Sequence, residues 1–239
     1  MARWVIDSGN TAVKVGVFEG NTLLRVYRFI PPDPAQWDEV GTEKPSSILL
    51  SDVAQRTFDV PWQVPLVSLK AHGPWPFQIQ YAETIGVDRL VLGAGLWALH
   101  GPEGAAALSL GTCLTVNVLQ PGGVFVGGPI SPGLQMRLQA MHHFTAKLPL
   151  VELPEKPKKV KNLTPKGTES ALLQGAIEGY QAEINHWVDR IWEEFPRLPI
   201  YFTGGDGSTF VNPQKKGIFA SPNLTLDGLN FMAVQLENE

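Results

Sequence analysis

The sequence predicts a mixed α/β protein made of two similar halves with a cleft between them. The chain opens with three short β-rich segments, and a second set of three begins about 100 residues later. In each set, a small polar loop containing glycine and threonine joins the first two segments. A cluster of turn-forming residues at 100–104 separates the two sets. We therefore expect an N-terminal half at residues 1–102 and a C-terminal half at residues 103–239.

Strands are expected to dominate the N-terminal half ahead of its main helix. Apolar and β-branched residues fill each expected strand, and turn-forming residues separate them. The first three segments are joined by tight turns, which fits strands better than helices. The expected strands cover residues 4–6, 13–18, 22–29, 47–50 and 65–69, with a short helix at 52–57.

Helices are expected where longer apolar segments occur. Residues 88–99 are apolar on most faces and predict a buried helix, in which Gly93 and Gly95 allow close packing. The C-terminal half repeats the pattern of strands followed by helices. We expect strands at 105–110, 114–119, 124–126 and 200–202, a helix starting near Pro132, and helices at 170–192 and 226–236.

The composition excludes some classes of protein. With 239 residues, 44% of them apolar, the chain can bury a sizeable core, so global disorder is excluded. A net charge of −4 argues against a protein that coats nucleic acid. No apolar run approaches the roughly 20 residues of a membrane span, and Asp7 interrupts any signal-peptide core. The single cysteine, Cys113, excludes an internal disulfide framework. We expect a soluble cytoplasmic protein.

The loop between the first two expected strands has the chemistry of a phosphate site. Gly9 lets backbone amides approach an anion, and Asn10 and Thr11 add hydrogen-bond donors. Asp7 can hold a hydrated Mg²⁺ that bridges phosphates, and Lys14 can reach the same phosphates. An ordinary polar hairpin contains the same residue types, so this loop alone leaves both interpretations open.

A second glycine–threonine loop, at residues 110–113, strengthens the phosphate interpretation. Two such hairpins that face each other from two halves make a phosphate clamp, to which Thr112 contributes. The chain contains neither G-x-x-x-x-G-K-[ST] nor G-x-G-x-x-G, which excludes a P-loop NTPase and disfavours a Rossmann dinucleotide site.

Two further turns carry residues suited to catalysis or binding. Asp88 and Arg89 lie at the start of the buried helix. One interpretation is a general base beside a guanidinium that binds a carboxylate. A capping carboxylate and a surface cation are the simpler reading of that pair. Gly204 and Gly205 follow a strand and could let a base or ribose lie against the backbone, or form a plain turn.

Together these segments resemble the type III pantothenate kinases, members of the actin-like, ribonuclease H-like phosphotransferase superfamily. The resemblance covers nearly the whole chain and depends on the order and spacing of its motifs. The matching segments are residues 7–14 (D-x-G-N-T-x-x-K), 86–89 (G-x-D-R), 127–134 (G-G-x-I-x-P-G-L), 142–149, 167–168 and 203–206 (T-G-G-D).

The resemblance implies two ribonuclease H-like halves and the phosphorylation of pantothenate by ATP, the first committed step toward coenzyme A. It implies that Asp88 accepts the proton of the substrate hydroxyl, that Arg89 pairs with the pantothenate carboxylate, and that Thr168 contacts substrate across a homodimer interface. It assigns ATP to Asp7, Ser8, Gly9, Asn10, Thr11, Lys14, Thr112, Gly204 and Gly205, and pantothenate to Gly86, Val87, Asp88, Arg89 and Thr168.

The chain departs from the family pattern in the second loop, which usually reads D-x-G-T-x-x-T-x-D. Ser109 and Asn117 replace the two acids. Because the first acid belongs to the family's monovalent-cation site, we expect K⁺ or NH₄⁺ to bind weakly or not at all at Ser109. The requirement for Mg²⁺ is expected to remain, since Asp7 is present.

A second departure lies upstream of the G-x-D-R motif. The family usually has a tyrosine and a proline there, at the positions that Ile79 and Ala82 occupy in this chain. Tyr81 is nearby, but in a strand its side chain would face the other side.

Two function classes therefore fit the sequence. An active kinase is favoured because Asp7, Lys14, Asp88 and Arg89 are all present. A non-catalytic member that binds nucleotide or pantothenate is the alternative, supported by the two lost acids. A sugar or acetate kinase of the same superfamily fits less well, because the chain is short and contains G-x-D-R.

Overall fold

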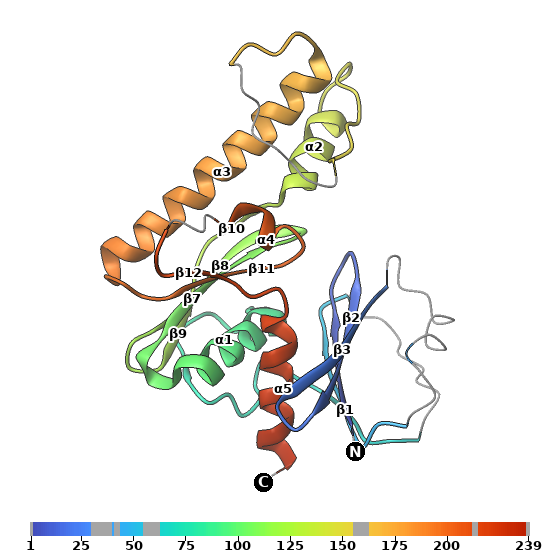
Figure 1. Ribbon diagram of the computed structural model, residues 1–239, viewed down its shortest axis with the longest axis vertical. Helices are drawn as coiled ribbons and strands as arrows, with labels where there is room; N and C mark the ends of the chain where they lie inside the picture. Colours follow the sequence, from blue (N-terminus) through green and yellow to red (C-terminus); the bar gives the residue numbers. More distant parts are fainter. Residues whose placement is uncertain are drawn as a thin grey trace. The chain divides into compact units, whose positions relative to one another are not determined.

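The computed structural model describes residues 2–29, 40, 44–54, 63–154, 163–211 and 215–237. The chain divides into two compact units, which Figure 1 shows as ribbons. Unit 1 combines Met1–Gly104, Val118–Gly127 and Asn223–Glu239, and unit 2 combines Ala105–Asn117 and Gly128–Pro222. The chain therefore returns to unit 1 twice after residue 104, at 118–127 and at its C-terminal end. A single division at residue 102 would assign both of these later segments to the C-terminal half, and it remains a prediction about domains.

Unit 1 contains a five-stranded sheet with the order β3-β2-β1-β4-β5. The first three strands are antiparallel neighbours, as their tight turns predicted, and β4 and β5 run parallel to β1. All five expected strands are confirmed. Their bounds are β1 Arg3–Ser8, β2 Val13–Glu19, β3 Thr22–Phe29, β4 Ile48–Asp52 and β5 Leu66–Ser68.

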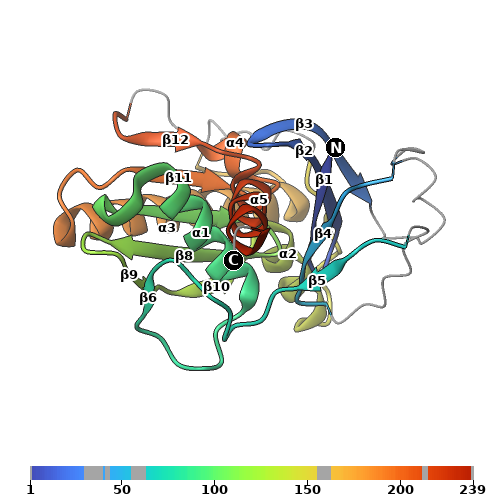
Figure 2. The same ribbon diagram turned by 90° about the horizontal axis from the view of Figure 1, so that it is seen from below.

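The two faces of this sheet differ in character. Successive side chains of a strand point to opposite faces, and Trp4, Ile6, Val13 and Val15 form an apolar core on one face. The opposite face carries Asp7 and is covered by α5 (Leu224–Glu237), which packs on β1, β2 and β4. Figures 1 and 2 both show α5 between these strands and α1 (Val87–His100).

The helices α1 and α5 touch backbone to backbone through glycines. A Cβ on Gly228 would collide with the main-chain oxygen of Val91 and would lie 2.8 Å from the nitrogen of Gly95. A Cβ on Gly95 would lie 2.6 Å from the main-chain oxygen of Leu224. The close packing expected from Gly93 and Gly95 is therefore confirmed, since a Cβ on Gly93 would also lie 2.7 Å from the ring of Phe125.

The last turn of α5 is tied to the start of the chain by a polar network. Arg3 pairs with Glu237 and donates from Nη1 to Oδ1 of Asn230 at 2.9 Å. Ser47 donates to Glu237 at 2.8 Å. These hydrogen bonds, chiefly from Arg3, lower the pKa of Glu237. The C-terminal half of α5 is thus held against the sheet of unit 1.

The second sheet has the strand order β12-β11-β7-β8-β9-β6, and β10 pairs with β8. In unit 2, β11 lies parallel to both β7 and β12. In unit 1, β9 pairs with the end of β8 and with β6. The bounds are β6 Gln78–Ile79, β7 Ala105–Leu110, β8 Cys113–Gln120, β9 Val124–Gly127, β10 Ile130–Pro132, β11 Ile200–Thr203 and β12 Ile218–Ala220.

Among its described residues unit 2 also contains three helices, and a 3₁₀ turn at Gly101–Glu103 follows α1 in unit 1. The 27-residue α3 is the longest helix among the described residues and packs on α2. No helix among the described residues combines the length and apolar character that a membrane span requires. The bounds are α2 Leu134–His143, α3 Thr168–Glu194 and α4 Gly207–Phe210.

The structure corrects some expected elements. The helix expected from Pro132 begins at Leu134, because Pro132 ends β10. Asp52, expected to start a short helix, ends β4, and residues 55–57 of that expected helix lie outside the described residues. Three strands and α4 were not expected, because elements of two to four residues are too short to show a periodicity.

The contact between α1 and α5 gives a prediction about stability. Replacing Gly228 with alanine should lower the free energy of unfolding by about 1–3 kcal/mol, because the added methyl group must push the two backbones apart. Chemical denaturation measures this change. Gly175 of α3, with open space where a Cβ would be, is the matched control. Gly175→Ala should stabilise by up to about 1 kcal/mol, and equal stabilisation by both substitutions would contradict the close contact.

Candidate active site

The first phosphate loop presents a charged pair on the helix-covered face of the unit 1 sheet. Asp7 of β1 lies directly opposite Lys14 of β2, and Ser51 is its neighbour on β4. Directly opposite residues share a face of the sheet. The main-chain nitrogen of Gly9 donates to the oxygen of Ala12 at 3.0 Å and closes the turn between the two strands. The loop thus holds its carboxylate and ammonium groups beside a tight, partly exposed turn.

Burial and a second carboxylate perturb the ionisation of Asp7. Burial, opposed by the charge of Lys14 and reinforced by that of Asp88, raises the pKa of Asp7 to about 6. Burial likewise raises the pKa of Asp88 and lowers the pKa of Lys14. Asp7 and Asp88 therefore lie close enough for the charge on one to disfavour the charge on the other. Perturbed pairs of this kind are typical of functional sites.

Asp88 is held at the N-terminus of α1 by main-chain amides. Its carboxylate accepts hydrogen bonds from the N–H groups of Arg89 and of Asp88 itself. Oδ1 occupies the space where a Cβ of Gly86 would be, so only glycine at that position leaves the carboxylate where it is. Asp88 thus lies in the first turn of α1, whose N-cap is Gly86 without a side-chain capping hydrogen bond. The charge of the same carboxylate also raises the pKa of Asp7.

Arg89 is buried, and its exposed neighbour is Tyr81. Nη1 of Arg89 donates to the hydroxyl of Tyr81 at 3.3 Å, and the guanidinium carbon lies 5.2 Å from the centre of the ring. The expectation that Tyr81 faces away from this motif was wrong. Strand alternation itself would place residue 81 on the same face as residue 79, since residues i and i+2 share a face. The strand β6 in any case ends at Ile79.

The second phosphate loop, in unit 2, is braced by two glycine turns. The nitrogen of Gly133 donates to the main-chain oxygen of Thr112 at 3.1 Å, and a Cβ on Gly133 would collide with this loop. Gly204 has φ +85°, and a Cβ there would collide with the backbone of Leu110. The nitrogen of Asp206 donates to the oxygen of Leu110 at 2.9 Å. The Thr203–Asp206 turn and the exposed Thr112 thus belong to one cluster of loops, in which Gly205 is exposed.

The two positions that replace family acids carry no charge. Ser109 of β7 lies beside Thr203 of β11. Asn117 is fully buried, and its amide donates to the hydroxyl of Thr115 at 3.0 Å. No group of three acidic, histidine or cysteine side chains that could hold a metal occurs within the described part of the chain.

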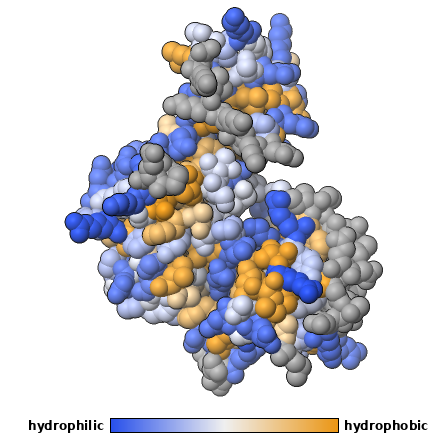
Figure 3. Space-filling model, viewed as in Figure 1, coloured by the Kyte–Doolittle hydropathy of each residue, from blue (hydrophilic) through white to orange (hydrophobic). Residues whose placement is uncertain are grey.

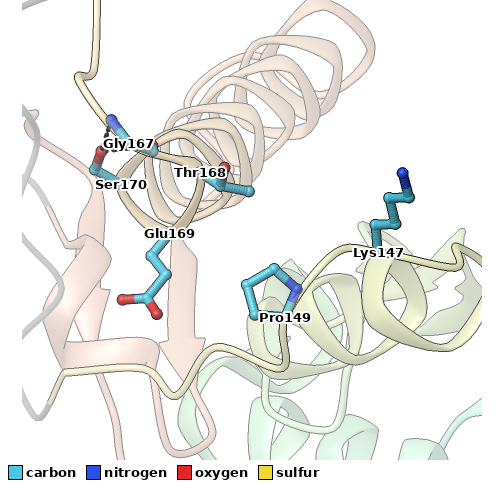
Figure 4. Close-up of a pocket in the computed structure, with 6 residues that line it drawn as sticks. All are labelled: Lys147, Pro149, Gly167, Thr168, Glu169 and Ser170. Atoms are coloured by element: carbon cyan, nitrogen blue, oxygen red, sulfur yellow. Dashed lines mark hydrogen bonds between the residues drawn. The ribbon is translucent and has the colours of Figure 1, made fainter.

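Thr168 lies at the first turn of α3, in another region of unit 2. It lines a cavity of about 650 Å³ together with Lys147, Pro149 and Glu169. Figure 4 shows Thr168 and Glu169 on the helix and Lys147 and Pro149 on the segment opposite. Figure 1 shows this end of α3 away from the sheet that carries the second loop. The structure therefore groups Thr112 with the Thr203–Asp206 turn, and leaves Thr168 apart from them.

Sequence reasoning missed Ser51 and misplaced Tyr81. Ser51 is fully buried beside Asp7, and its hydroxyl has no hydrogen-bond partner among the described residues. Its position at the carboxyl end of a strand parallel to β1 was the available signal, since polar groups gather at such ends. Ser8 was expected to bind nucleotide, but its hydroxyl is buried on the face opposite Asp7. The residue as a whole is 0% exposed, so the structure leaves no part of Ser8 open to a ligand.

The charges around Asp7 give a prediction about its titration. In a ¹³C NMR titration of labelled aspartate, the Asp7 carboxyl should titrate near pH 6 rather than near pH 4. Because Lys14 lowers this pKa and Asp88 raises it, Lys14→Gln should move the midpoint up and Asp88→Asn should move it down. A midpoint near 4 that neither substitution moves would contradict the grouping of these three charges.

Comparison with known proteins shows which family the chain is similar to. Residues 44–190 match the family model described as type III pantothenate kinase. The chain is 36% identical to the type III pantothenate kinase of Christiangramia forsetii, over 95% of this chain and 96% of that protein. It is 35% identical to that of Cytophaga hutchinsonii, with the same coverage.

Solved structures show the fold. A protein from Campylobacter jejuni described as a Baf family transcriptional activator superposes with a TM-score of 0.65 at 18% identity, covering 99% of this chain and all of that one. The activator of 2-hydroxyisocaproyl-CoA dehydratase from Clostridium difficile, solved with bound ADPNP, gives 0.58 at 11% identity, covering 100% and 96%. The expected ribonuclease H-like, actin-like α/β fold is confirmed by such neighbours. From the family model and the curated relatives, the chain belongs to the type III pantothenate kinase family.

Proposed function

We propose that this protein transfers the γ-phosphate of ATP to the primary hydroxyl of pantothenate, giving 4′-phosphopantothenate and ADP. This is the first step of coenzyme A biosynthesis, and we place it in the cytoplasm, where ATP is available. The observation that carries the proposal is the grouping in unit 1 of Asp7 and Lys14 with Asp88, next to Arg89. Membership in the family supports it further.

Asp88 is assigned as the general base. A base works best when its pKa lies near the working pH, and burial raises the pKa of Asp88 toward that range. The main-chain amides of α1 fix the carboxylate, so little reorganisation is needed when it accepts the hydroxyl proton. The hydroxyl oxygen would then attack the γ-phosphorus in line with the departing ADP oxygen.

Arg89 is assigned to the pantothenate carboxylate, with Gly86 and Val87 beside it. A buried guanidinium presents a rigid fork of donors that suits a carboxylate, and Arg89 is only 4% exposed. Because it follows Asp88 directly in the chain, one helix end would hold the reacting hydroxyl and the far carboxylate of the same substrate.

ATP is assigned to the two phosphate loops and the glycine turn of β11. Lys14 and the amides of the first loop suit phosphate oxygens, and the exposed Thr112 and Gly205 suit contacts to nucleotide. The residues assigned to ATP are Asp7, Gly9, Asn10, Thr11, Lys14, Thr112, Gly204 and Gly205. Ser8, which is fully buried, is left out of this assignment.

Magnesium fits the first loop. Mg²⁺ is usually held by one or two carboxylates together with substrate phosphates, and Asp7, with Asp88 near it, provides such a setting. Bound there through the phosphates, the ion would neutralise charge on the transferred group. A monovalent cation does not fit Ser109, since neither Ser109 nor Asn117 supplies a charge.

We further propose a homodimer in which Thr168 contacts the substrate of the other subunit. The apolar segment 124–138 gives this dimer little support, because its residues Phe125, Leu134 and Leu138 are buried within the chain itself. Support comes instead from exposed apolar side chains elsewhere in unit 2, Phe144 at 82% and Leu163 at 87% exposure. On the face shown in Figure 3, hydrophobic side chains gather over α2.

The alternative is a non-catalytic member that only binds nucleotide or pantothenate. The uncharged Ser109 and Asn117 favour it. The grouping of Asp7, Lys14 and Asp88 favours the kinase, since binding alone does not require a buried carboxylate whose pKa a second carboxylate raises further.

Asp88→Asn tests the proposal. In an assay that couples ADP release to pantothenate addition, this variant should lose at least about a hundredfold in kcat, because the amide accepts no proton. The dissociation constant for pantothenate should change much less. Asp227→Asn is the matched control, since Asp227 is a partly buried aspartate of α5 whose pKa is also raised. Near-normal turnover in Asp88→Asn would reject the assigned role, and an inactive wild-type protein would favour the non-catalytic alternative.

The uncharged second loop gives a prediction about cations. In a potassium titration at constant ionic strength, ADP release should change little, because the charge that attracts the ion is missing at Ser109. Ser109→Asp should introduce a saturable response to potassium. Strong activation of the wild-type protein at millimolar potassium would contradict the prediction, and would point to Asp206, whose main chain adjoins the second loop.

A further inference from the structure

We propose that Tyr81 is a substrate-positioning residue that selects for a carboxylate. In this proposal, which rests on the function proposed above, Tyr81 fixes the Arg89 guanidinium and donates its own hydroxyl proton to the substrate carboxylate. The two side chains then form one recognition unit for an anionic end group.

The contacts of Arg89 are the first support. Arg89 is 4% exposed, whereas Tyr81 is 41% exposed, so the tyrosine forms the solvent-facing side of the pair. Nη1 of Arg89 donates to the tyrosine oxygen at 3.3 Å, and the guanidinium carbon lies 5.2 Å from the ring centre. The ring and the hydroxyl both restrain the guanidinium, which leaves it less freedom to turn away from a ligand.

The direction of the hydrogen bond decides what Tyr81 can offer. A guanidinium has donors and no acceptor, so the tyrosine oxygen must be the acceptor in this pair. The hydroxyl proton of Tyr81 therefore remains available to another group. A carboxylate that approaches from the exposed side can accept from Tyr81 and from Arg89 together. An alcohol oxygen carries no negative charge, so it forms weaker hydrogen bonds with the same two donors.

A glycine provides the space for both side chains. Gly127, at the end of β9, has φ +67°, a conformation that favours glycine. A Cβ there would lie 2.8 Å from Cδ2 and Cε2 of Tyr81 and 3.2 Å from Nη2 of Arg89. The tyrosine ring and the guanidinium thus both rest against the same glycine, and any side chain at residue 127 would displace them.

The backbone holds Tyr81 in register with this glycine. Gln78 and Ile79 pair with Val124 and Phe125 of β9, and the nitrogen of Gln80 donates to the oxygen of Phe125 at 2.9 Å. The segment therefore follows β9 one residue beyond the end of β6, which delivers Tyr81 to the level of Gly127. The position is set by main-chain hydrogen bonds and does not depend on a ligand.

Tyr81→Phe tests the inference, because it keeps the ring and removes the hydroxyl. It should raise the KM for pantothenate about tenfold or more, as expected for a lost hydrogen bond to a charged group, and leave kcat within about threefold. The KM for pantothenol, which has an alcohol in place of the carboxylate, should be the same in Tyr81→Phe as in the wild-type protein. The KM for ATP should also stay unchanged. Calorimetric binding of pantothenate should weaken by the same factor as KM.

Two further variants separate this role from a structural one. Gly127→Ala leaves Tyr81 and Arg89 chemically intact, but its methyl group would occupy the space against which both side chains pack. It should therefore lower the preference for pantothenate over pantothenol in the same way. Tyr201→Phe, which removes a hydroxyl from a ring stacked on Phe219 in unit 2, should change none of these constants.

The outcomes distinguish this inference from the proposed function. Wild-type KM and wild-type preference for pantothenate in Tyr81→Phe would overturn the inference while the kinase assignment stands. An equal loss with pantothenate and pantothenol, or a loss confined to kcat, would also overturn it. A wild-type protein that neither phosphorylates nor binds pantothenate would contradict the proposed function and this inference with it.

Discussion

The arrangement of unit 1 depends on the backbone contact between α1 and α5. Gly228 and Gly95 let the two helices approach more closely than any side chain would allow. Through this contact, α5 joins α1 to the sheet on which it packs. The network of Arg3 and Glu237 fixes the far end of the same helix. Asp88 at the start of α1 is thereby held near Asp7 of β1. A segment from the C-terminal end of the chain thus positions two carboxylates from its first hundred residues.

Keeping these carboxylates together opposes their ionisation. Burial raises the pKa of both Asp7 and Asp88. The charge of Lys14 offsets this only partly for Asp7, and burial lowers the pKa of Lys14 itself. A group of charges with no task would gain stability from apolar replacements. In a phosphoryl transferase, the same group supplies a base close to the working pH and a charged setting for phosphate and metal. The electrostatic strain is therefore understandable as a requirement of the reaction.

Features determined by residues close together in the chain could be predicted from the sequence, and features determined by contacts between distant residues could not. Strands such as 13–18 and 22–29 were predicted, because their alternation and turns are local. The charged pair at Asp7 and Lys14 was also visible, since both lie in one hairpin. The membership of 223–239 in unit 1 was not, because the contact of Gly228 with α1 joins residues far apart in the chain. Tyr81 was misplaced because residues two apart in a strand share a face, so even a continued strand would have put it on the side of residue 79.

The most direct test of the account is a crystal structure with pantothenate and a non-hydrolysable ATP analogue. The account predicts the primary hydroxyl of pantothenate within hydrogen-bond reach of Asp88, about 3 Å. The substrate carboxylate should lie on Arg89, and the phosphates on the loop that carries Asp7. Pantothenate bound in the reverse direction, or a hydroxyl far from Asp88 with the γ-phosphate elsewhere, would contradict it.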